Sequence, residues 1–450
     1  MAIALAIIGA ILAVFLVIVI HEFGHFLVAK MCGVKILRFS IGFGKSLYTH
    51  VSRGGTEYVL AILPLGGYVK MLDDREFHVS QTDSQRAYNR QPLYIRMAIV
   101  LAGPVTNFLL AVVAFWIIFS MGVTYIKPVV GQVRAQSVAE QAGIKPGDTI
   151  VAIDGRKVRQ WQQVMVTFIE RIGWVQPVYI TTEKNGVAEQ HQISLKQWRI
   201  SGSQPDPLDS LGITPYQPAI PAIVDKIMAH SPAQRSGLQP GDQIVKVDDH
   251  PVSDWQTVAD FIKQHPNQES ALTISRNNQT KLVNVQLDSQ TINRQRAGYL
   301  GVIVKIPPWP AQMIDSTHYS LITAWAPALQ QSWELTKFNC IVLAKMFSGK
   351  ISMQTLGGPI TIFRSAGAAS EAGLKVYLNF IGFISVTLAF INILPIPGLD
   401  GGHFLFQLIE GLIGRPISEK YQNLLLKLGI IVIILLVLQG TVNDIIRLFQ

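Results

Sequence analysis

The first twenty residues of the chain contain no charged side chain, and this run constrains the fold more than any other feature. A helix needs about 20 apolar residues to cross a bilayer, so the run predicts a membrane span. It leads directly into an HEFGH sequence over residues 21–25. Ionisable side chains at membrane depth are costly, and we therefore expect these residues to have a function.

The HEFGH sequence has the spacing of a zinc-binding helix. Residues four apart share one helix face, so His21 and His25 can direct two imidazole nitrogens at one metal ion. Glu22 can then accept a proton from a water molecule activated there. The rival interpretation is a pair of core histidines without metal, which would need other partners in an apolar setting. We predict a hydrolytic site with one Zn²⁺ per chain and Glu22 as catalytic residue.

The composition indicates a multi-pass α-helical membrane protein. The 450 residues are 49% hydrophobic and 15% charged, with a mean hydropathy of +0.32, which is too apolar for an ordinary soluble enzyme. The net charge of +9 is better explained by Lys and Arg on cytoplasmic loops than by nucleic-acid binding. Cys32 and Cys340 predict neither a disulfide framework nor a cysteine metal site. Four transmembrane helices are expected at 1–30, 97–121, 377–400 and 426–443.

Charges on the first connecting region, 31–96, predict the orientation. Residues 30–96 contain ten Lys and Arg against five Asp and Glu, which places this region in the cytoplasm. Both termini and residues 122–376 then lie on the other side, which in the inner membrane of a Gram-negative bacterium would be the periplasm, and the site lies near the cytoplasmic side. Residues 58–71 predict a β-hairpin around Pro and Gly-Gly, which either dips into the membrane beside the site or lies on the surface.

The region between the second and third spans contains an internal repeat. Trp161 and Trp255 are 94 residues apart, and the same offset relates two copies of a G-[IL]-x-P-G-D turn. A period of this length indicates two copies of one domain. The copies resemble circularly permuted bacterial PDZ domains, which implies an α+β fold over 125–220 and 221–308. They either bind an extended peptide at a sheet edge or exclude large proteins from the site.

Residues 321–347 are apolar with interspersed polar groups. The spacing suits an amphipathic helix on the membrane surface. A helix packed in a core is the alternative.

A catalytic zinc ion usually takes three protein ligands, so a third must come from another segment. The third predicted span ends in a polar segment that contains Asp400. The first and third spans run in the same direction, each for roughly 30 Å before its polar group. His21, His25 and Asp400 can therefore meet near the cytoplasmic side. Two alternatives stay open, because Asp400 can instead cap a helix and His403 can instead be the third ligand.

Four features together resemble the site-2 protease family of intramembrane zinc metalloproteases. They are the HEFGH sequence, a Gly-Pro-Val-Thr-Asn sequence at 103–107, the tandem PDZ-like copies and an NxLPxPxLDGGH sequence at 392–403. The resemblance covers essentially the whole chain. It implies His21, His25 and Asp400 as zinc ligands and Glu22 as the catalytic glutamate. The substrate-binding residues that it implies are Asn392, Pro395 and Pro397, with Gly66, Gly67 and Tyr68 in a membrane-reentrant β-loop.

The resemblance implies hydrolysis of peptide bonds within transmembrane segments of single-span substrates. The implied substrates are a pre-trimmed anti-sigma factor in an extracytoplasmic stress response and remnant signal peptides. A substrate helix must unwind to be cleaved, and pairing with the β-loop edge would satisfy its backbone. The alternatives are a non-catalytic PDZ adaptor anchored by four helices and a transporter, the latter disfavoured because no inverted repeat relates the spans.

Overall fold

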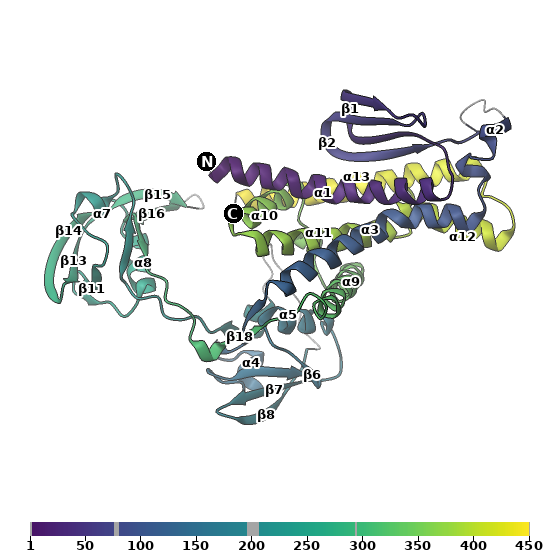
Figure 1. The fold of residues 1–450 in the computed structure, drawn as a ribbon. Helices are drawn as coiled ribbons and strands as arrows, with labels where there is room; N and C mark the ends of the chain where they lie inside the picture. The colour runs from purple at the N-terminus through teal and green to yellow at the C-terminus, as the bar shows by residue number, and fades with distance from the viewer. Residues whose placement is uncertain (1, 76–80, 196–206, 293–294, 450) are drawn as a thin grey trace.

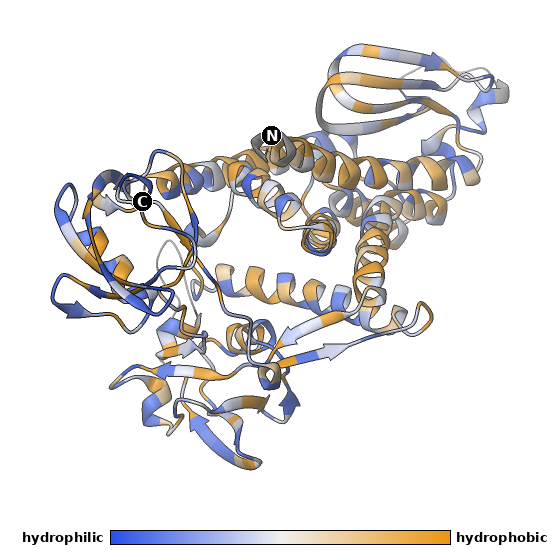
Figure 2. Cartoon of the chain, turned by 60° about the vertical axis from the view of Figure 1, so that its left-hand side comes forward, coloured by the Kyte–Doolittle hydropathy of each residue, from blue (hydrophilic) through white to orange (hydrophobic). Residues whose placement is uncertain are grey.

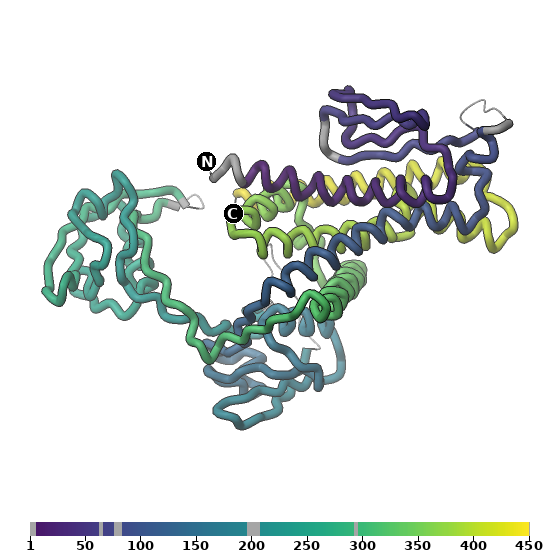
Figure 3. Tube along the Cα trace, viewed as in Figure 1, coloured from purple at the N-terminus to yellow at the C-terminus, as the bar shows by residue number. Residues whose placement is uncertain are grey.

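A computed structural model describes residues 2–75, 81–195, 207–292 and 295–449. Parts of the predicted β region and of both repeat copies, at 76–80, 196–206 and 293–294, lie outside the described residues. Long helices form a bundle, a β-sheet lies along one side of it, and two smaller α+β units lie on the other side (Figure 1). The bundle is predominantly hydrophobic and the two units are mixed (Figure 2). The two described ends of the chain lie at the same end of the bundle (Figure 3).

Among the described residues, four helices are long and apolar enough to cross a membrane. They are α1 (Ala2–Met31), α3 (Leu93–Ser120), α11 (Leu374–Ile393) and α13 (Glu419–Leu448). Glycines bring α3 close to its neighbours: a Cβ on Gly24 of α1 would lie 2.3 Å from Thr106 Oγ1, and one on Gly382 of α11 would lie 2.6 Å from the Phe115 ring. Only 11% of the apolar window of α13 is buried, so most of its side chains can face lipid.

The apolar segment predicted over 377–400 is helical only as far as Ile393. Leu394 is extended, with ψ 142°, because the residue before a proline disfavours the helical region. A loop over 394–399 follows, and α12 (Asp400–Ile413) begins directly after it. A Cβ on Gly401 would lie 2.2 Å from the Leu394 carbonyl oxygen. The glycine therefore lets the start of α12 pack against the loop.

The helix α9 (Trp325–Phe347) runs across the bundle and is seen nearly end-on in Figure 1. One face packs against α3, where Ala328 and Leu335 share a buried cluster with Phe115 and Phe119. The opposite side leaves large apolar side chains exposed, among them Trp333. The amphipathic helix predicted over 321–347 therefore packs one face against α3 and leaves the other face exposed.

Asp444 of α13 joins that helix to α10 (Pro359–Glu371). Its carboxylate accepts hydrogen bonds from the backbone N–H groups of Gly358 and Thr361, at 3.0 and 2.9 Å, and from the Thr361 hydroxyl. It therefore caps the N-terminus of α10, where unpaired N–H groups favour an anion.

Replacing Asp444 by Ala is expected to destabilise the bundle by about 2 kcal/mol, because a charged cap and its hydrogen bonds are lost. The thermal denaturation midpoint of the purified full-length protein measures this. Glu371→Ala, at an exposed position of α10, is the matched control. Equal midpoints for the two variants would contradict the capping role.

The sheet beside α1 consists of β1 (Ile36–Val51) and β2 (Glu57–Met71), which bend so that each contributes two strand segments. Residues 36–41 pair on one side with 57–60 and on the other with 67–71. Phe26 of α1 contacts the rings of Phe39 and Tyr58. The hairpin predicted at 58–71 is therefore part of a larger sheet packed on α1. The short helix α2 (Gln81–Ser84) follows it.

The two smaller units share the same order of elements as far as β8 and β14, after which the first has α6 where the second has the paired strands β15 and β16. The first contains a four-stranded sheet in the order β6-β5-β7-β8, and the second one in the order β12-β11-β13-β14. The first unit comprises β4 (Val130–Val133), α4 (Val138–Gln141), β5 (Thr149–Ile153), β6 (Arg156–Lys157), α5 (Trp161–Glu170), β7 (Val178–Lys184), β8 (Val187–Ile193), α6 (Pro207–Leu211) and β9 (Ile213–Pro215). The second comprises β10 (Val224–Ile227), α7 (Pro232–Arg235), β11 (Gln243–Val247), β12 (His250–Pro251), α8 (Trp255–Gln264), β13 (Glu269–Arg276), β14 (Gln279–Gln286), β15 (Asp288–Ile292), β16 (Gln295–Tyr299) and β17 (Val302–Val304). From β4 and β10 to α5 and α8, the first residues of corresponding elements lie 94 positions apart.

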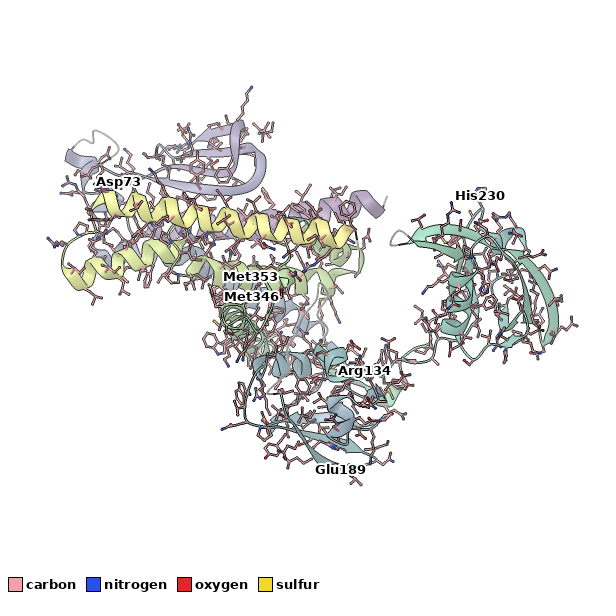
Figure 4. All side chains as sticks on the ribbon, turned by 180° about the vertical axis from the view of Figure 1, so that it is seen from behind. Asp73, Arg134, Glu189, His230, Met346 and Met353 are labelled. Atoms are coloured by element: carbon pink, nitrogen blue, oxygen red, sulfur yellow. The ribbon has the colours of Figure 1, made fainter. Side chains whose placement is uncertain are left out.

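The repeated Pro-Gly-Asp turn has the same hydrogen bond in both units. Asp148 Oδ2 accepts from the Lys145 N–H at 2.9 Å, and Asp242 Oδ2 accepts from the Gln239 N–H at 2.8 Å. The carboxylate closes the turn before the next strand, which explains why the motif needs Asp at this position. The strands β3 (Val123–Ile126) and β18 (Ile314–Thr317) pair where the chain enters and leaves the two units. Seen from behind, Arg134 and Glu189 lie on the first unit and His230 on the second (Figure 4).

Candidate metal centre

Three side chains from two distant parts of the chain converge at one point of the bundle. His21 Nε2 lies 3.3 Å from His25 Nε2 and 3.2 Å from Asp400 Oδ2. The distance from His25 Nε2 to Asp400 Oδ2 is 3.4 Å. Both histidines are buried, with exposed fractions of 8% and 9%. The structure thus brings together the three ligands that the sequence suggested.

This donor set fits zinc. Zinc bonds to nitrogen and oxygen of about 2.0–2.2 Å in a tetrahedral arrangement separate neighbouring ligand atoms by roughly 3.3 Å. Asp400 Oδ2 is buried and makes no hydrogen bond within the described residues, as expected of an oxygen reserved for a metal. His403 is exposed on α12 and lies outside this group of potential ligands.

The second ring nitrogen of each histidine faces a group on α3. His25 Nδ1 lies 2.7 Å from the carbonyl oxygen of Ile99 and donates to it. This fixes the tautomer whose Nε2 has a free lone pair for a metal. The carboxamide of Asn107, which is fully buried, lies 3.4 Å from His21 Nδ1. The helix α3 therefore orients both imidazoles.

Gly103 of α3 lies directly against the two rings. A Cβ at this position would lie 2.2 Å from His25 Nε2 and 2.7 Å from His21 Cε1. Only glycine leaves room for this approach. The Thr106 hydroxyl, 3.0 Å from the Ile20 carbonyl oxygen, links the same two helices one turn away. The Gly-Pro-Val-Thr-Asn sequence therefore packs α3 closely against α1, which the sequence alone did not show.

Asp400 is the first residue of α12, and this helix is fixed to α3 by an ion pair. Arg96 Nη1 lies 3.1 Å from Glu410 Oε2, and the two side chains form a bidentate ion pair. Arg96 lies about one turn before Ile99 on α3. The ion pair therefore sets the position of the Asp400 helix relative to the helix that orients His25.

Glu22 is half-buried on α1 and faces the β-sheet. A Cβ on Gly67 of β2 would lie 3.0 Å from Glu22 Cγ and 2.7 Å from the Ser40 carbonyl oxygen. Gly66 has φ +137°, in the region that favours glycine. The Tyr68 hydroxyl lies 3.3 Å from Arg38 Nη1. Gly67 therefore lies next to the glutamate.

The last turn of α11 reaches the same site through Asn392. Its Nδ2 lies 3.4 Å from His21 Nε2. Pro397 instead packs against α13, where a Cβ on Gly429 would meet the proline carbonyl oxygen. Pro395 is exposed. The structure thus places Asn392 at the cluster of His21, His25 and Asp400, and the two prolines in the loop beside it.

Comparison with known proteins decides the family. Residues 9–436 match the family described as Peptidase family M50. The chain belongs to peptidase family M50. It is 39% identical over 439 residues to the regulator of sigma-E protease RseP of Salmonella typhimurium, and 38% identical over 440 residues to that of Escherichia coli; each match covers 97% of this chain and 98% of the relative. A putative zinc metalloprotease of Vibrio cholerae is 36% identical over 444 residues, with 98% of both chains covered.

Among solved structures, the PDZ domain of an SdrC-like protein from Listeria innocua matches 19% of this chain and 92% of its own, with 18% identity and a TM-score of 0.17. The M50 assignment confirms the predicted resemblance to site-2 proteases. This M50 peptidase is a zinc metalloprotease and a membrane protein, which favours catalysis over the non-catalytic adaptor.

Proposed function

We propose that His21, His25 and Asp400 hold the zinc ion of this peptidase and that Glu22 is its general base. The observation that carries the proposal is the convergence of three candidate ligand atoms within 3.4 Å of one another. Glu22 directly follows His21 and lies next to β2. When bound, zinc polarises the scissile carbonyl and acidifies water. Glu22 accepts the proton from the attacking water and passes it to the leaving amine.

The strand at Gly67 is the proposed binding edge for the substrate. A transmembrane substrate must leave its helical hydrogen bonds before cleavage, and the freed groups need partners at membrane depth. The segment Gly66, Gly67 and Tyr68 can supply them by pairing as a neighbouring strand. The absence of a side chain at Gly67 lets this edge itself lie close to Glu22. Asn392 and the loop with Pro395 and Pro397 would close the opposite side.

We propose four membrane spans with both termini outside the cytoplasm, in a bacterial inner membrane. The basic region over 31–96 would face the cytoplasm, with the metal centre near that side. The two repeat units are proposed to be periplasmic PDZ domains. This assignment is supported by their repeated strand order and Pro-Gly-Asp turns. The helix α9 would lie at the membrane surface beneath them.

The relatives named regulators of sigma-E protease support a role in the sigma-E extracytoplasmic stress response. We propose that the substrates are a membrane-embedded anti-sigma factor trimmed on the periplasmic side, and remnant signal peptides. The two units would either reject untrimmed proteins by size or bind their peptides.

Purified protein in proteoliposomes, mixed with a trimmed or an untrimmed anti-sigma factor, tests this proposal. We expect cleavage of the trimmed substrate within its span, little cleavage of the untrimmed one, and loss of cleavage with the zinc chelator phenanthroline. Cleavage that persists in excess chelator would contradict the mechanism. Equal cleavage of both substrates would contradict the substrate class.

A further inference from the structure

A cavity of about 400 Å³ lies between the first repeat unit and α9, away from the metal centre. We call it the interface pocket. Its walls come from β6, α5 and the loop between them, from α9, and from the end of α3. Aromatic rings line part of it: Phe119, Tyr125, Tyr319 and Phe338. Its volume lies within the range of small-ligand sites, roughly 300–1,000 Å³.

The interface pocket is positively charged. Three bases line it, Arg156, Lys157 and Arg159, against one acid, Glu334. Arg156 is neutralised, because it pairs with Glu334 and its Nη1 lies 3.5 Å from Glu170 Oε2. For Lys157 and Arg159 the described part of the chain contains no ion pair. Two uncompensated cations beside aromatic walls favour a ligand that joins an anionic group to an apolar portion.

The pocket lies beside the expected bilayer surface. Phe119 is the penultimate residue of the membrane-spanning helix α3. One turn earlier, Trp116 stacks on Trp325 of α9 at 5.0 Å between ring centroids and donates to the Leu321 carbonyl oxygen at 2.7 Å. Trp333, also on α9, is 54% exposed. Tryptophans of this kind mark the level of lipid headgroups.

The second repeat unit provides an internal comparison. The residues that correspond to Lys157 and Arg159, 94 positions later, are Pro251 and Ser253. The second unit keeps the same sheet order without these bases, so the fold does not require them. It also stands away from the bundle, whereas the first unit contacts α9 (Figures 1 and 4). The bases are therefore confined to the unit that reaches the membrane helices.

We propose that the interface pocket binds the phosphate-bearing headgroup of an anionic membrane lipid. Lys157 and Arg159 donate to the phosphate oxygens, and the aromatic walls cover the glycerol and the first acyl carbons. The amides of Gln160 and Gln163, which also line the pocket, can bond the headgroup hydroxyls. A lipid held in this way links the first unit to α9 and to the bilayer.

Native mass spectrometry of the full-length protein in neutral detergent tests the proposal. Phosphatidylglycerol, phosphatidylcholine and soluble glycerol phosphate are added separately at equal concentrations. The test variant is Lys157→Gln/Arg159→Gln, and the matched control is Lys226→Gln/Lys246→Gln, which removes two exposed bases from the second unit. We expect phosphatidylglycerol to bind best, and the test variant to bind it about tenfold more weakly than the wild type, because charged hydrogen bonds are lost. The control should match the wild type.

Equal binding of the two lipids, or equal losses in the test and control variants, would overturn the proposal. Glycerol phosphate that binds as tightly as the lipid would reassign the pocket to a free phosphate ligand. Displacement of the lipid by a peptide with a free carboxylate would reassign it to a protein ligand. If the double variant melts at a lower temperature than the wild type, Arg159→Gln alone provides the same comparison.

Discussion

Replacing Glu22 by Gln is expected to slow peptide hydrolysis by about 1,000-fold while the protein keeps its zinc. The amide has nearly the size of the carboxylate, so the side chain can keep its place beside Gly67. It cannot accept the proton of the attacking water. The proposed ligand atoms come from His21, His25 and Asp400, and none is changed.

Cleavage of a single-span substrate in proteoliposomes measures this effect, and elemental analysis of the same preparation measures zinc. Glu371→Gln, at an exposed position on α10, is the control and should cleave like the wild type. Near-normal cleavage by Glu22→Gln would remove Glu22 from the chemistry. Loss of zinc in that variant would show instead that Glu22 holds the metal.

Replacing Gly103 by Ala is expected to abolish both zinc binding and cleavage, although the change adds one methyl group. Its Cβ would lie 2.2 Å from His25 Nε2 and 2.7 Å from His21 Cε1. No Cβ tolerates such distances, so α3 must retreat or both rings must turn away. Either movement separates ligand atoms that now lie within 3.4 Å of one another, and metal sites tolerate only small displacements.

The matched control is Gly411→Ala on α12, where the nearest atom to the new Cβ, at 2.8 Å, is the end of the Leu93 side chain. A flexible side chain can yield, so zinc and cleavage should persist. Zinc content and cleavage rate are measured for both variants. A Gly103→Ala protein with one zinc per chain and normal cleavage would contradict the packing of α3 against the ligands.

The candidate ligands were accessible from the sequence because they depend on local spacing and span direction. These left His403 as an alternative to Asp400, and the resemblance to site-2 proteases favoured Asp400. Four residues separate His21 from His25 on one helix face, and the common direction of two spans brings Asp400 to their depth. The early end of α11 was also foreseeable, since Pro395 and Pro397 cannot continue a helix. The helix ends at Ile393 because Leu394, the residue before Pro395, disfavours the helical region.

The surroundings of the ligands were not accessible in this way, because they depend on contacts between distant residues. His25 bonds a carbonyl oxygen 74 residues away, and Arg96 pairs with Glu410, 314 residues away. Every residue has a backbone carbonyl group, so the sequence does not indicate which one accepts a hydrogen bond. An Arg near the end of a span is interpreted from sequence as a cytoplasmic charge. Gly103 stood in a recognisable sequence, but only the packing of α3 on α1 shows why a side chain is excluded there.

Zinc content of the purified full-length protein, compared between Asp400→Ala and His403→Ala, tests the metal centre most directly. The wild type should contain one zinc ion per chain. We expect Asp400→Ala to lose it, because its buried Oδ2 lies 3.2 and 3.4 Å from the two imidazole nitrogens. The exposed His403 should be replaceable without loss. Full zinc content in Asp400→Ala, or loss of zinc in His403→Ala, would contradict the proposed centre.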